Sequence, residues 1–267
     1  MLEETALKMP LNAFGIFKYF KSRFMFAKQN PNYFVPDGLT IFVGPQGSGK
    51  TLSAVQYVKK VLKDYPKCKL VTNIFINDYP IVTYEEYIHN NGLYDNEVSK
   101  KIYNQDNRVF PFNNADDLEQ YKNDDLGVLF FIDEIQLYFN SLESKNINMD
   151  TMSVFSQQRK QRLHIVATSQ VFGRMAKPLR EQFSNVIKCE CILGMLQHNK
   201  FIDRDSLLDS NDDSHLDGKV KHRYFWFHKY KYYQDYDTYY LIHRNKFISN
   251  ELKKGDIYDS TELSNNS

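Results

Sequence analysis

The fold of this chain is decided by eight consecutive residues, Gly44-Pro45-Gln46-Gly47-Ser48-Gly49-Lys50-Thr51. They match the pattern G-x-x-x-x-G-K-[ST] at every fixed position, and its glycines let several backbone N–H groups point at one anion. The apolar run at residues 39–43 predicts a buried strand before the pattern. Apolar residues after it recur at the spacing of one helix face, at Leu52, Val55, Val58 and Leu62. This strand–loop–helix context favours a phosphate-binding loop over an ordinary glycine-rich turn.

The last two residues of the loop carry the side chains expected to meet a nucleotide. In such loops the lysine, here Lys50, bridges the β- and γ-phosphates, and the hydroxyl of Thr51 is a ligand of Mg²⁺. The N-terminus of the following helix adds a positive dipole end. We therefore expect residues 44–51 to bind ATP, with Thr51 as a metal ligand.

A second site element follows the most apolar run of the chain, residues 128–132. Asp133 and Glu134 stand directly after it, in the form of a Walker B strand. Ligands of an open α/β sheet bind at the carboxyl ends of its strands, so both carboxylates are expected near the phosphate loop. Asp133 would complete the Mg²⁺ site. Glu134, on the other side of the chain, would orient or deprotonate the attacking water, the alternative being a solvated charge at the strand end.

Polar and basic residues around the next strand complete the predicted catalytic set. Gln170 follows residues 164–169 and can both donate and accept hydrogen bonds, which suits a sensor of the γ-phosphate. Arg159 and Arg162 precede that strand, and a guanidinium from a neighbouring subunit would stabilise transition-state charge. The other candidates are Arg174 and Arg180, and a plain surface role is equally compatible with any one of the four.

The order of expected elements predicts an α/β protein of the P-loop NTPase class. Helices alternate with strands, which favours a mostly parallel sheet with helices on both faces. One polar helix is expected after Asn113 or Asn114, and another from Asp150 to about Arg162. The expected strands are residues 39–43, 69–73, 108–112, 128–133, 164–169 and 186–189.

Composition restricts the class of protein further. The 267 residues include 34 basic and 33 acidic side chains, a formal net charge of +1, so any nucleic-acid contact must be a local patch. No run approaches about eighteen apolar residues, and the N-terminus lacks the features of a secretory signal. The cysteines Cys68, Cys189 and Cys191 have no zinc spacing, and they predict a reducing, cytosolic setting. Cys189 and Cys191 would share one strand face, where burial is favoured over a redox role.

We expect three segments along the chain: an N-terminal Phe-rich extension (1–38), an ATPase core (39–194) and a C-terminal subdomain with its tail (195–267). In the extension, Phe14, Phe17, Phe20 and Phe24 recur at helix spacing. Such a helix could lie on a membrane or a partner, but its basic residues are not segregated from the phenylalanines, which favours packing on the core.

The C-terminal segment is expected to begin with an exposed loop at residues 203–217 and to end in a β-hairpin appendage. The hairpin strands are residues 224–230 and 239–243, around a turn at 234–237. Basic residues interleave with the aromatic ones here, as in surfaces that bind single-stranded nucleic acid. Alternating aromatic residues also pack a hairpin on a core, and we favour packing.

With these elements in order, the chain resembles the zonular occludens toxin family over roughly residues 39–260. That family includes the cytoplasmic ATPase part of filamentous-phage assembly proteins and is related to the FtsK–HerA group of DNA-pumping ATPases. The residues that carry the resemblance are the loop 44–51, Val71-Thr72-Asn73, Phe131-Ile132-Asp133-Glu134 with Leu137-Tyr138-Phe139-Asn140, Gln158-Arg159-Lys160, residues 165–170, Leu179-Arg180, Asn185-Val186-Ile187 and Tyr258-Asp259-Ser260.

The resemblance implies roles and partners. Lys50 and Thr51 match the nucleotide loop, Asp133 and Glu134 the Walker B pair, Gln170 the sensor and Arg159 the arginine before the sensor strand. It implies a ring of copies, a hexamer, acting on DNA with phage or mobile-element assembly proteins. Members that extrude filamentous phage carry a transmembrane helix after this domain, whereas this sequence ends at Ser267. We therefore expect a cytoplasmic protein that meets the inner face of the host membrane by a partner or by peripheral contact.

Two functional hypotheses follow. The first is a Mg²⁺-dependent ATPase of a phage or mobile element that powers DNA movement in virion assembly, extrusion or genome packaging. The second is a nucleotide-dependent adaptor that recruits a partner to a membrane or replication complex without moving DNA. A toxin activity finds no support in the sequence.

Overall fold

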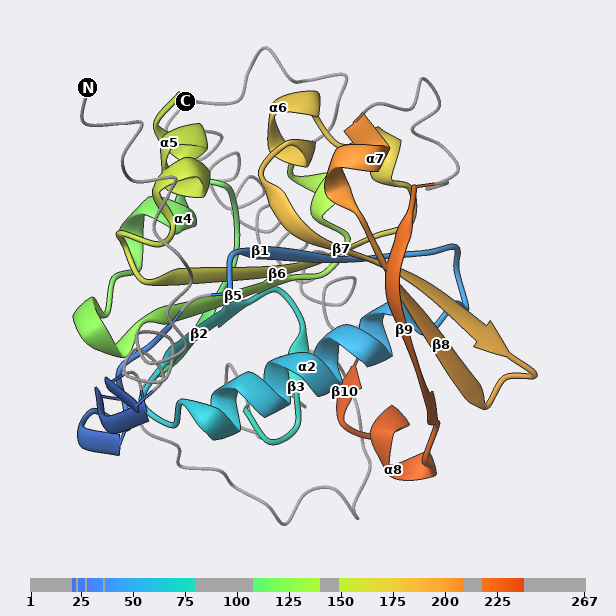
Figure 1. Ribbon diagram of the computed structural model, residues 1–267, viewed down its shortest axis with the longest axis horizontal. Coiled ribbons are helices and arrows are strands. Elements are labelled where there is room, and N and C mark those ends of the chain that lie inside the picture. Colours follow the sequence, from blue (N-terminus) through green and yellow to red (C-terminus); the bar gives the residue numbers. More distant parts are fainter. Residues whose placement is uncertain are drawn as a thin grey trace, which may run out of the picture.

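The computed structural model describes residues 21–79 except positions 23, 27 and 36, and residues 108–139, 149–208 and 218–237. Within these residues the chain forms an eight-stranded sheet in the order β4-β2-β5-β6-β1-β7-β8-β9 (Figure 1). The strands are β1 (Leu39–Val43), β2 (Lys69–Thr72), β4 (Val109–Pro111), β5 (Val128–Ile132), β6 (Leu163–Ser169), β7 (Phe183–Ile192), β8 (Leu196–Ile202) and β9 (Val220–Phe227). A separate two-stranded sheet pairs β3 (Phe75–Ile76) with β10 (Tyr236–Asp237).

The strands from β4 to β7 in this order all pair in parallel, whereas β8 and β9 pair antiparallel. The central parallel strands β1, β5 and β6 are buried along their whole length. Burial on both faces explains why these strands are mostly apolar in the sequence instead of alternating between apolar and polar residues.

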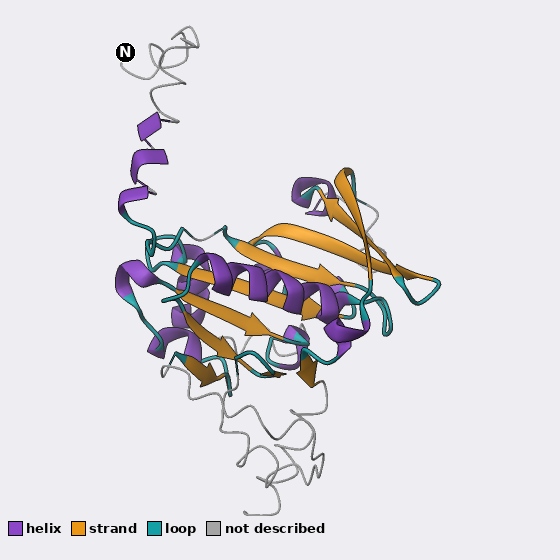
Figure 2. Ribbon diagram, turned by 90° about the horizontal axis from the view of Figure 1, so that it is seen from below, coloured by secondary structure: helices purple, strands orange, loops and turns teal. Residues whose placement is uncertain are grey.

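Helices cover both faces of the sheet (Figures 1 and 2). Helix α2 (Lys50–Asp64) lies on one face, where Val55, Val58 and Leu62 pack in one cluster with Phe42 and Phe131 of the sheet. Full burial of each such side chain stabilises the fold by about 1.5–3 kcal/mol. The opposite face is covered by α4 (Asp117–Gln120), α5 (Met149–Gln157), α6 (Lys177–Arg180) and α7 (Arg204–Leu208). The predicted α/β class with a mostly parallel sheet is confirmed.

Strand β6 lies between β1, which enters the phosphate loop, and β5, which ends before the two carboxylates. Parallel pairing brings the carboxyl ends of these three strands to one edge of the sheet. The register continues to Val43↔Ser169 on one side of β6 and to Ile132↔Ala167 on the other. The topology thus gathers the loop, the carboxylates and Gln170 at a single edge.

Several predicted boundaries were wrong. The expected helix from Asp150 to about Arg162 ends at Gln157, because residues 158–162 form turns and Arg162 has a φ of 55°. The loop expected at 203–217 begins with helix α7. Strand β8 was not predicted at all. It forms a hairpin with β7 around Leu193 and Gly194, whose φ angles are 53° and 69°.

The C-terminal hairpin is also revised. The first expected strand is β9, and it pairs with β8 as a continuation of the main sheet. It is followed by the short helix α8 (Tyr230–Tyr233), and the expected turn contains strand β10, which pairs with β3. The second expected strand, residues 239–243, lies outside the described residues, as does the motif at 258–260. Residue 194, the expected end of the core, lies in the turn between two paired strands of one sheet.

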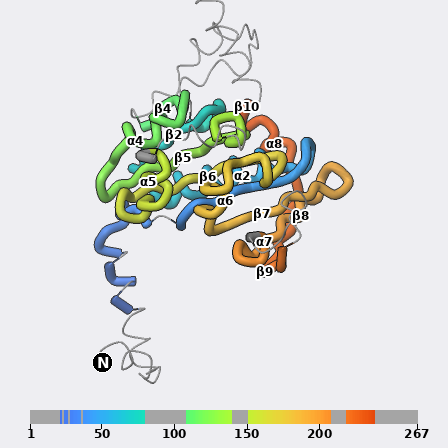
Figure 3. Tube along the Cα trace, turned by 90° about the horizontal axis from the view of Figure 1, so that it is seen from above, coloured from blue at the N-terminus to red at the C-terminus, as the bar shows by residue number. Residues whose placement is uncertain are grey.

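The described helical part of the Phe-rich extension, within residues 21–29, projects from the body of the molecule, whereas Phe34 of the same extension is buried (Figures 2 and 3). Phe24 is 69% exposed and Phe26 is 45% exposed, so the favoured packing on the core was wrong for this part. Phe14, Phe17 and Phe20 lie outside the described residues. None of the helices that the structure describes is long and apolar enough to cross a membrane.

Candidate active site

The phosphate loop joins β1 to α2, and its shape depends on glycine. Gly47 and Gly49 have φ angles of 79° and 74°, a left-handed conformation that glycine adopts without strain. The Ser48 N–H donates to the Pro45 carbonyl at 3.2 Å, which closes the turn. Helix α2 begins at Lys50 without a side-chain cap on its first turn. Its first N–H groups therefore point toward the loop, where an anion can accept their hydrogen bonds.

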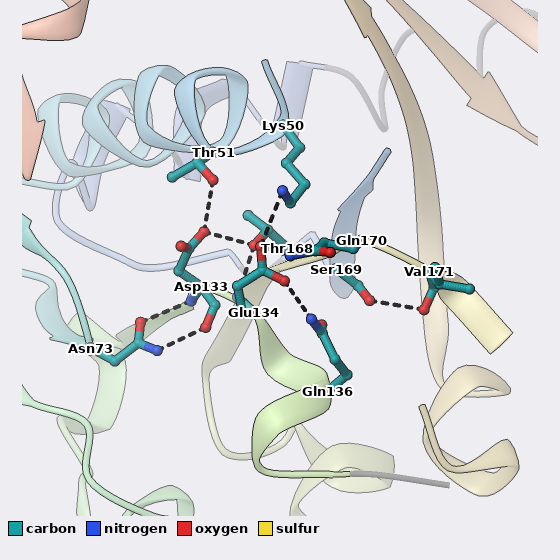
Figure 4. Close-up of polar contacts among 10 residues, drawn as sticks. All are labelled: Lys50, Thr51, Asn73, Asp133, Glu134, Gln136, Thr168, Ser169, Gln170 and Val171. Carbon is teal, nitrogen blue, oxygen red and sulfur yellow. Dashed lines mark hydrogen bonds and ion pairs between the residues drawn. The ribbon is translucent and has the colours of Figure 1, made fainter. Parts of the chain in front are cut away.

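Asp133 is held by two hydroxyl groups from neighbouring elements (Figure 4). Thr51 Oγ1 donates to Asp133 Oδ1 at 3.0 Å, and Thr168 Oγ1 donates to the same oxygen at 2.7 Å. The contact with Thr51 joins the first turn of α2 to the end of β5. It brings a hydroxyl and a carboxylate together, the oxygen ligands that Mg²⁺ uses in proteins beside water and substrate phosphates. These residues fit the metal that the sequence predicts.

Asn73, at the end of β2, fixes the backbone of the same aspartate. Its Nδ2 donates to the Asp133 carbonyl and its Oδ1 accepts from the Asp133 N–H, both at 2.8 Å. Asn73 Nδ2 also donates to the hydroxyl of Tyr138 at 3.3 Å. Asn73 is fully buried, so the amide orients this backbone in a site with little water.

Glu134 turns toward the phosphate loop because its backbone leaves the strand conformation. With a φ of 53°, it breaks the alternation that would send its side chain to the other face. Its carboxylate forms an ion pair with Lys50, with Oε1 3.1 Å from Nζ. Gln170 Nε2 donates to Oε1 at 3.3 Å, and Gln136 donates to Oε2. The Glu134 N–H donates to Thr168 Oγ1 at 2.9 Å, which ties this turn to β6.

The electrostatics of Asp133 reflect its position at the bottom of the site. Burial raises the pKa of this carboxyl group above its usual range, and the charge of Glu134 acts in the same direction. The hydrogen bonds from Thr168 and Thr51 and the charge of Lys50 act in the opposite direction. A divalent cation beside such a carboxylate would favour its ionised form further.

These groups line a cavity of about 660 Å³, within the range that binds small ligands in proteins. One wall carries the predicted residues Lys50, Thr51, Asp133, Glu134 and Gln170, together with Gln46, Gly47 and Gly49 of the loop. The rest of the lining includes residues that sequence analysis did not assign to the site: Leu52, Cys191, Gly194, His228, Tyr233 and Tyr236.

None of the four candidate arginines is among the described residues that line this cavity. Arg159 is exposed and precedes β6, at the end of the strand opposite Gln170. Arg162 lies over the ring of Tyr33, 4.0 Å from its centroid. Arg174 closes a 3₁₀ turn, η6 (Phe172–Arg174), just after β6, and Arg180 ends α6. A role for Arg159 in a neighbouring subunit stays a prediction.

Two further residues of the site, Asn73 and Thr168, carried no predicted role. A signal for them existed, because both are polar residues at the carboxyl ends of buried strands, the same feature that identifies Asp133. The contribution of residues 191–236 had no such signal. For Cys191 and Gly194 it depends on the hairpin of β7 and β8, and for His228, Tyr233 and Tyr236 it depends on the path of the chain after β9, which returns across α2.

Comparison with known proteins gives one family. The family model described as zonular occludens toxin (Zot) matches residues 38–234. No curated protein matches the sequence.

The solved structures that are similar to this chain include the following three. The N-terminal domain of zonular occludens toxin from Neisseria meningitidis is 16% identical, with 75% of this chain and 98% of that chain covered and a TM-score of 0.44. The genome packaging NTPase B204 from Sulfolobus turreted icosahedral virus 2, in complex with ATP-gammaS, is 15% identical, with 73% and 98% covered and a TM-score of 0.43. B204 from Sulfolobus turreted icosahedral virus, described as a DNA-packaging ATPase, is 14% identical, with 58% and 76% covered and a TM-score of 0.35.

Proposed function

This chain belongs to the zonular occludens toxin family, and from that membership and the geometry of its site we propose that it is a Mg²⁺-dependent ATPase of a phage or mobile element that powers DNA movement. The observation that carries the enzymatic part is the meeting of two loops at one sheet edge. Thr51 contacts Asp133 at 3.0 Å, and Lys50 contacts Glu134 at 3.1 Å. A loop that only bound phosphate would not need two carboxylates opposite its lysine and threonine.

The division of work between the two carboxylates follows from their partners. Thr51 and Asp133 would hold Mg²⁺, and bound Mg²⁺ would neutralise phosphate charge as a Lewis acid. Lys50 can exchange the Glu134 carboxylate for phosphate oxygens when a nucleotide enters. Glu134 is then free to orient a water molecule, with Gln170, now 3.3 Å from Glu134 Oε1, able to contact both water and phosphate.

Contact with DNA is supported by an exposed face of the antiparallel strands. Arg223, Phe225 and Phe227 share one face of β9, because their partners in register on β8 are Lys200, His198 and Leu196. Phe225 is 57% exposed and Phe227 is 66% exposed, so the favoured packing interpretation does not hold for these two rings. Basic and aromatic side chains on one surface bind a single strand by charge and stacking. We propose that a ring of copies, a hexamer by the resemblance, uses this face in the host cytoplasm.

The test is ATP turnover by the purified chain, measured alone and with single- or double-stranded DNA. Lys50→Ala should abolish hydrolysis, because the loop loses its phosphate ligand. Glu134→Gln should bind ATP but not turn it over, because the amide cannot activate water. Lys60→Ala changes an exposed lysine on the same helix and serves as the matched control.

Undiminished turnover in both site variants would defeat the proposal. Slow turnover that neither form of DNA stimulates would favour the adaptor hypothesis instead. The molecular mass of the assembled protein, with and without ATP, tests the ring.

A further inference from the structure

The cavity continues beyond the groups that a triphosphate needs, to a wall made by residues 228–237, which we call the strap. The strap leaves β9, forms α8 and ends in β10, and it supplies His228, Tyr233 and Tyr236 to the lining. We propose that the strap binds the base of a nucleoside triphosphate, with the ring of Tyr233 as the stacking surface. This inference rests on the proposed function, because it assigns the other end of the same ligand.

Tyr233 has the exposure that a stacking surface requires. The side chain is 49% exposed although it lines a cavity, so a large part of its ring is free of protein contacts. Its hydroxyl is not free, because it lies 2.5 Å from His228 Nδ1. The polar end of the ring is therefore fixed, while the half-exposed ring contributes to the lining of the cavity, an arrangement that suits a flat aromatic ligand.

A relay of hydrogen bonds connects this ring to the phosphate loop. Gln197, fully buried on β8, donates from Nε2 to the Ser48 carbonyl at 2.9 Å. Its Oε1 lies 2.9 Å from His228 Nε2 and can only accept, so His228 carries its proton on Nε2. The remaining nitrogen, Nδ1, then accepts from Tyr233. The position of the ring is thus set relative to the backbone that would hold the phosphates.

The strap is also anchored on its other side. Asp235 is buried, and its carboxylate accepts from Gln56 Nε2 and pairs with Lys59 of α2, both at 2.9 Å. Its carbonyl accepts from the Asn77 N–H at 2.9 Å. Anchors before and after Tyr233 hold the strap between the phosphate loop and the middle of α2, so this wall of the cavity is built into the fold.

Inorganic tripolyphosphate separates the two ends of the ligand, because it offers the phosphates without a base. Binding of ATP and of tripolyphosphate, each with Mg²⁺, is measured by calorimetry in the Glu134→Gln background, where hydrolysis is expected to stop. Tyr233→Ala should weaken ATP binding about tenfold, the size of a lost stacking contact, and change tripolyphosphate binding less than about twofold. Tyr233→Leu tests the aromatic ring at similar bulk, and Tyr233→Phe should keep most of the affinity.

The matched control is Tyr230→Ala, which removes a ring of the same short helix that is 80% exposed and is not among the residues that line the cavity. It should leave both ligands unaffected. The base site would be overturned if Tyr233→Ala and Tyr233→Leu weakened the binding of ATP and of tripolyphosphate equally. It would also be overturned if both variants bound ATP as the parent does. Either result would leave the ATPase proposal intact. If the parent protein, Glu134→Gln, bound neither ATP nor tripolyphosphate, both the base site and the ATPase proposal would be overturned.

Discussion

Two adjacent side chains, Asp133 and Glu134, make different contacts because the backbone between them changes conformation. Asp133 directly follows β5, and its carboxylate meets the hydroxyls of Thr51 and Thr168. Glu134 has a φ of 53° and reaches Lys50. Strained backbone of this kind costs about 1–3 kcal/mol and persists where surrounding contacts fix it. Here the contact that fixes it is the hydrogen bond from the Glu134 N–H to Thr168 Oγ1.

Thr168 therefore acts on both carboxylates at once, which gives the first prediction. Thr168→Val keeps the shape but removes a donor to Asp133 and an acceptor for the Glu134 N–H. We expect a loss of about 1–3 kcal/mol in the free energy of unfolding, because Thr168 is fully buried, and a fall in ATP turnover of about 10–100-fold. Thr168→Ser should restore both values. Urea unfolding and steady-state turnover check this, and wild-type activity in the valine variant would contradict it.

Two glycines of the loop allow a matched comparison, which gives the second prediction. Both have positive φ, so alanine costs about 1–2 kcal/mol at either position. A Cβ on Gly47 meets nothing within 4 Å, whereas one on Gly49 would lie 2.0 Å from Gln197 Oε1. Gln197 is buried and held by hydrogen bonds, so it cannot swing away cheaply. We expect Gly49→Ala to destabilise the protein by about 2–4 kcal/mol, clearly more than Gly47→Ala. Equal losses in the free energy of unfolding for the two variants, measured with urea, would show that Gln197 moves aside at little cost.

At the scale of elements, strand β6 carries a buried histidine that makes stability depend on pH. His164 Nδ1 donates to the Gly38 carbonyl at 2.6 Å, and Nε2 lies 3.0 Å from the Tyr57 hydroxyl. Burial lowers the pKa of His164 below its usual range, although the bond to Gly38 and the charge of Asp37 act in the opposite direction. The folded state thus prefers the neutral ring.

The third prediction takes its sign from that preference. Below about pH 6.5 the unfolded chain binds a proton at His164, whereas the folded chain keeps the ring neutral to lower pH. The free energy of unfolding therefore falls as the pH falls. Above that pH His164 is neutral in both states, and its contribution to the free energy of unfolding no longer changes with pH. We expect the wild type to lose up to about 1.4 kcal/mol per pH unit more than His164→Gln between pH 6.5 and 5. Urea unfolding at several pH values measures both slopes, and parallel slopes would refute the assignment.

The strap gives the fourth prediction, because a single carboxylate holds much of it. Burial alone would lower the pKa of Lys59, but its hydrogen bonds to Asp78 and Asp235 raise it above the usual value. Asp235→Asn removes one of these charges and should cost about 1–3 kcal/mol of stability. Hydrogen exchange should accelerate in residues 228–237. Asp205→Asn, at a carboxylate 81% exposed, is the control. Unchanged exchange in the strap would mean that other contacts hold it.

The elements that the sequence predicts are those whose buried positions are apolar. Strands β1 and β5 are apolar apart from Thr40, and the glycine pattern between β1 and α2 identifies the loop. Strand β8 escapes prediction because the buried Gln197 and Asn199 occupy its inner positions. These amides are satisfied by Ser48, Ser53 and Tyr224. The hydrogen-bond partners are distant in the sequence, so no local pattern reveals that polar residues face inward. The two-residue strand β10 is too short to produce a pattern.

At the scale of the whole molecule, Lys50 is the one Lys or Arg side chain among the described residues that line the cavity, which leaves transition-state charge without a second such cation there. Arg159 stands at the far end of β6 from the site, where it is exposed. An arginine so placed cannot serve its own subunit, but it can serve a neighbour in a ring. The two cases, action in the same subunit and action in a neighbour, differ in whether Arg159 and Glu134 of one working site belong to the same chain.

The fifth prediction uses that distinction. Arg159→Ala should be inactive, although its own loop and carboxylates are intact, and Glu134→Gln should be inactive although its Arg159 is intact. When the two variants are mixed in equal amounts, some interfaces combine a complete carboxylate pair from one subunit with the arginine of the other. ATP turnover should therefore reappear in the mixture, at about a quarter of the wild-type rate if subunits mix at random and each interface works independently. Arg174→Ala, mixed in the same way, tests the arginine on the site's own sheet edge. A mixture of Arg159→Ala and Glu134→Gln that stays inactive, although native mass measurements show mixed assemblies, would remove Arg159 from the catalytic set.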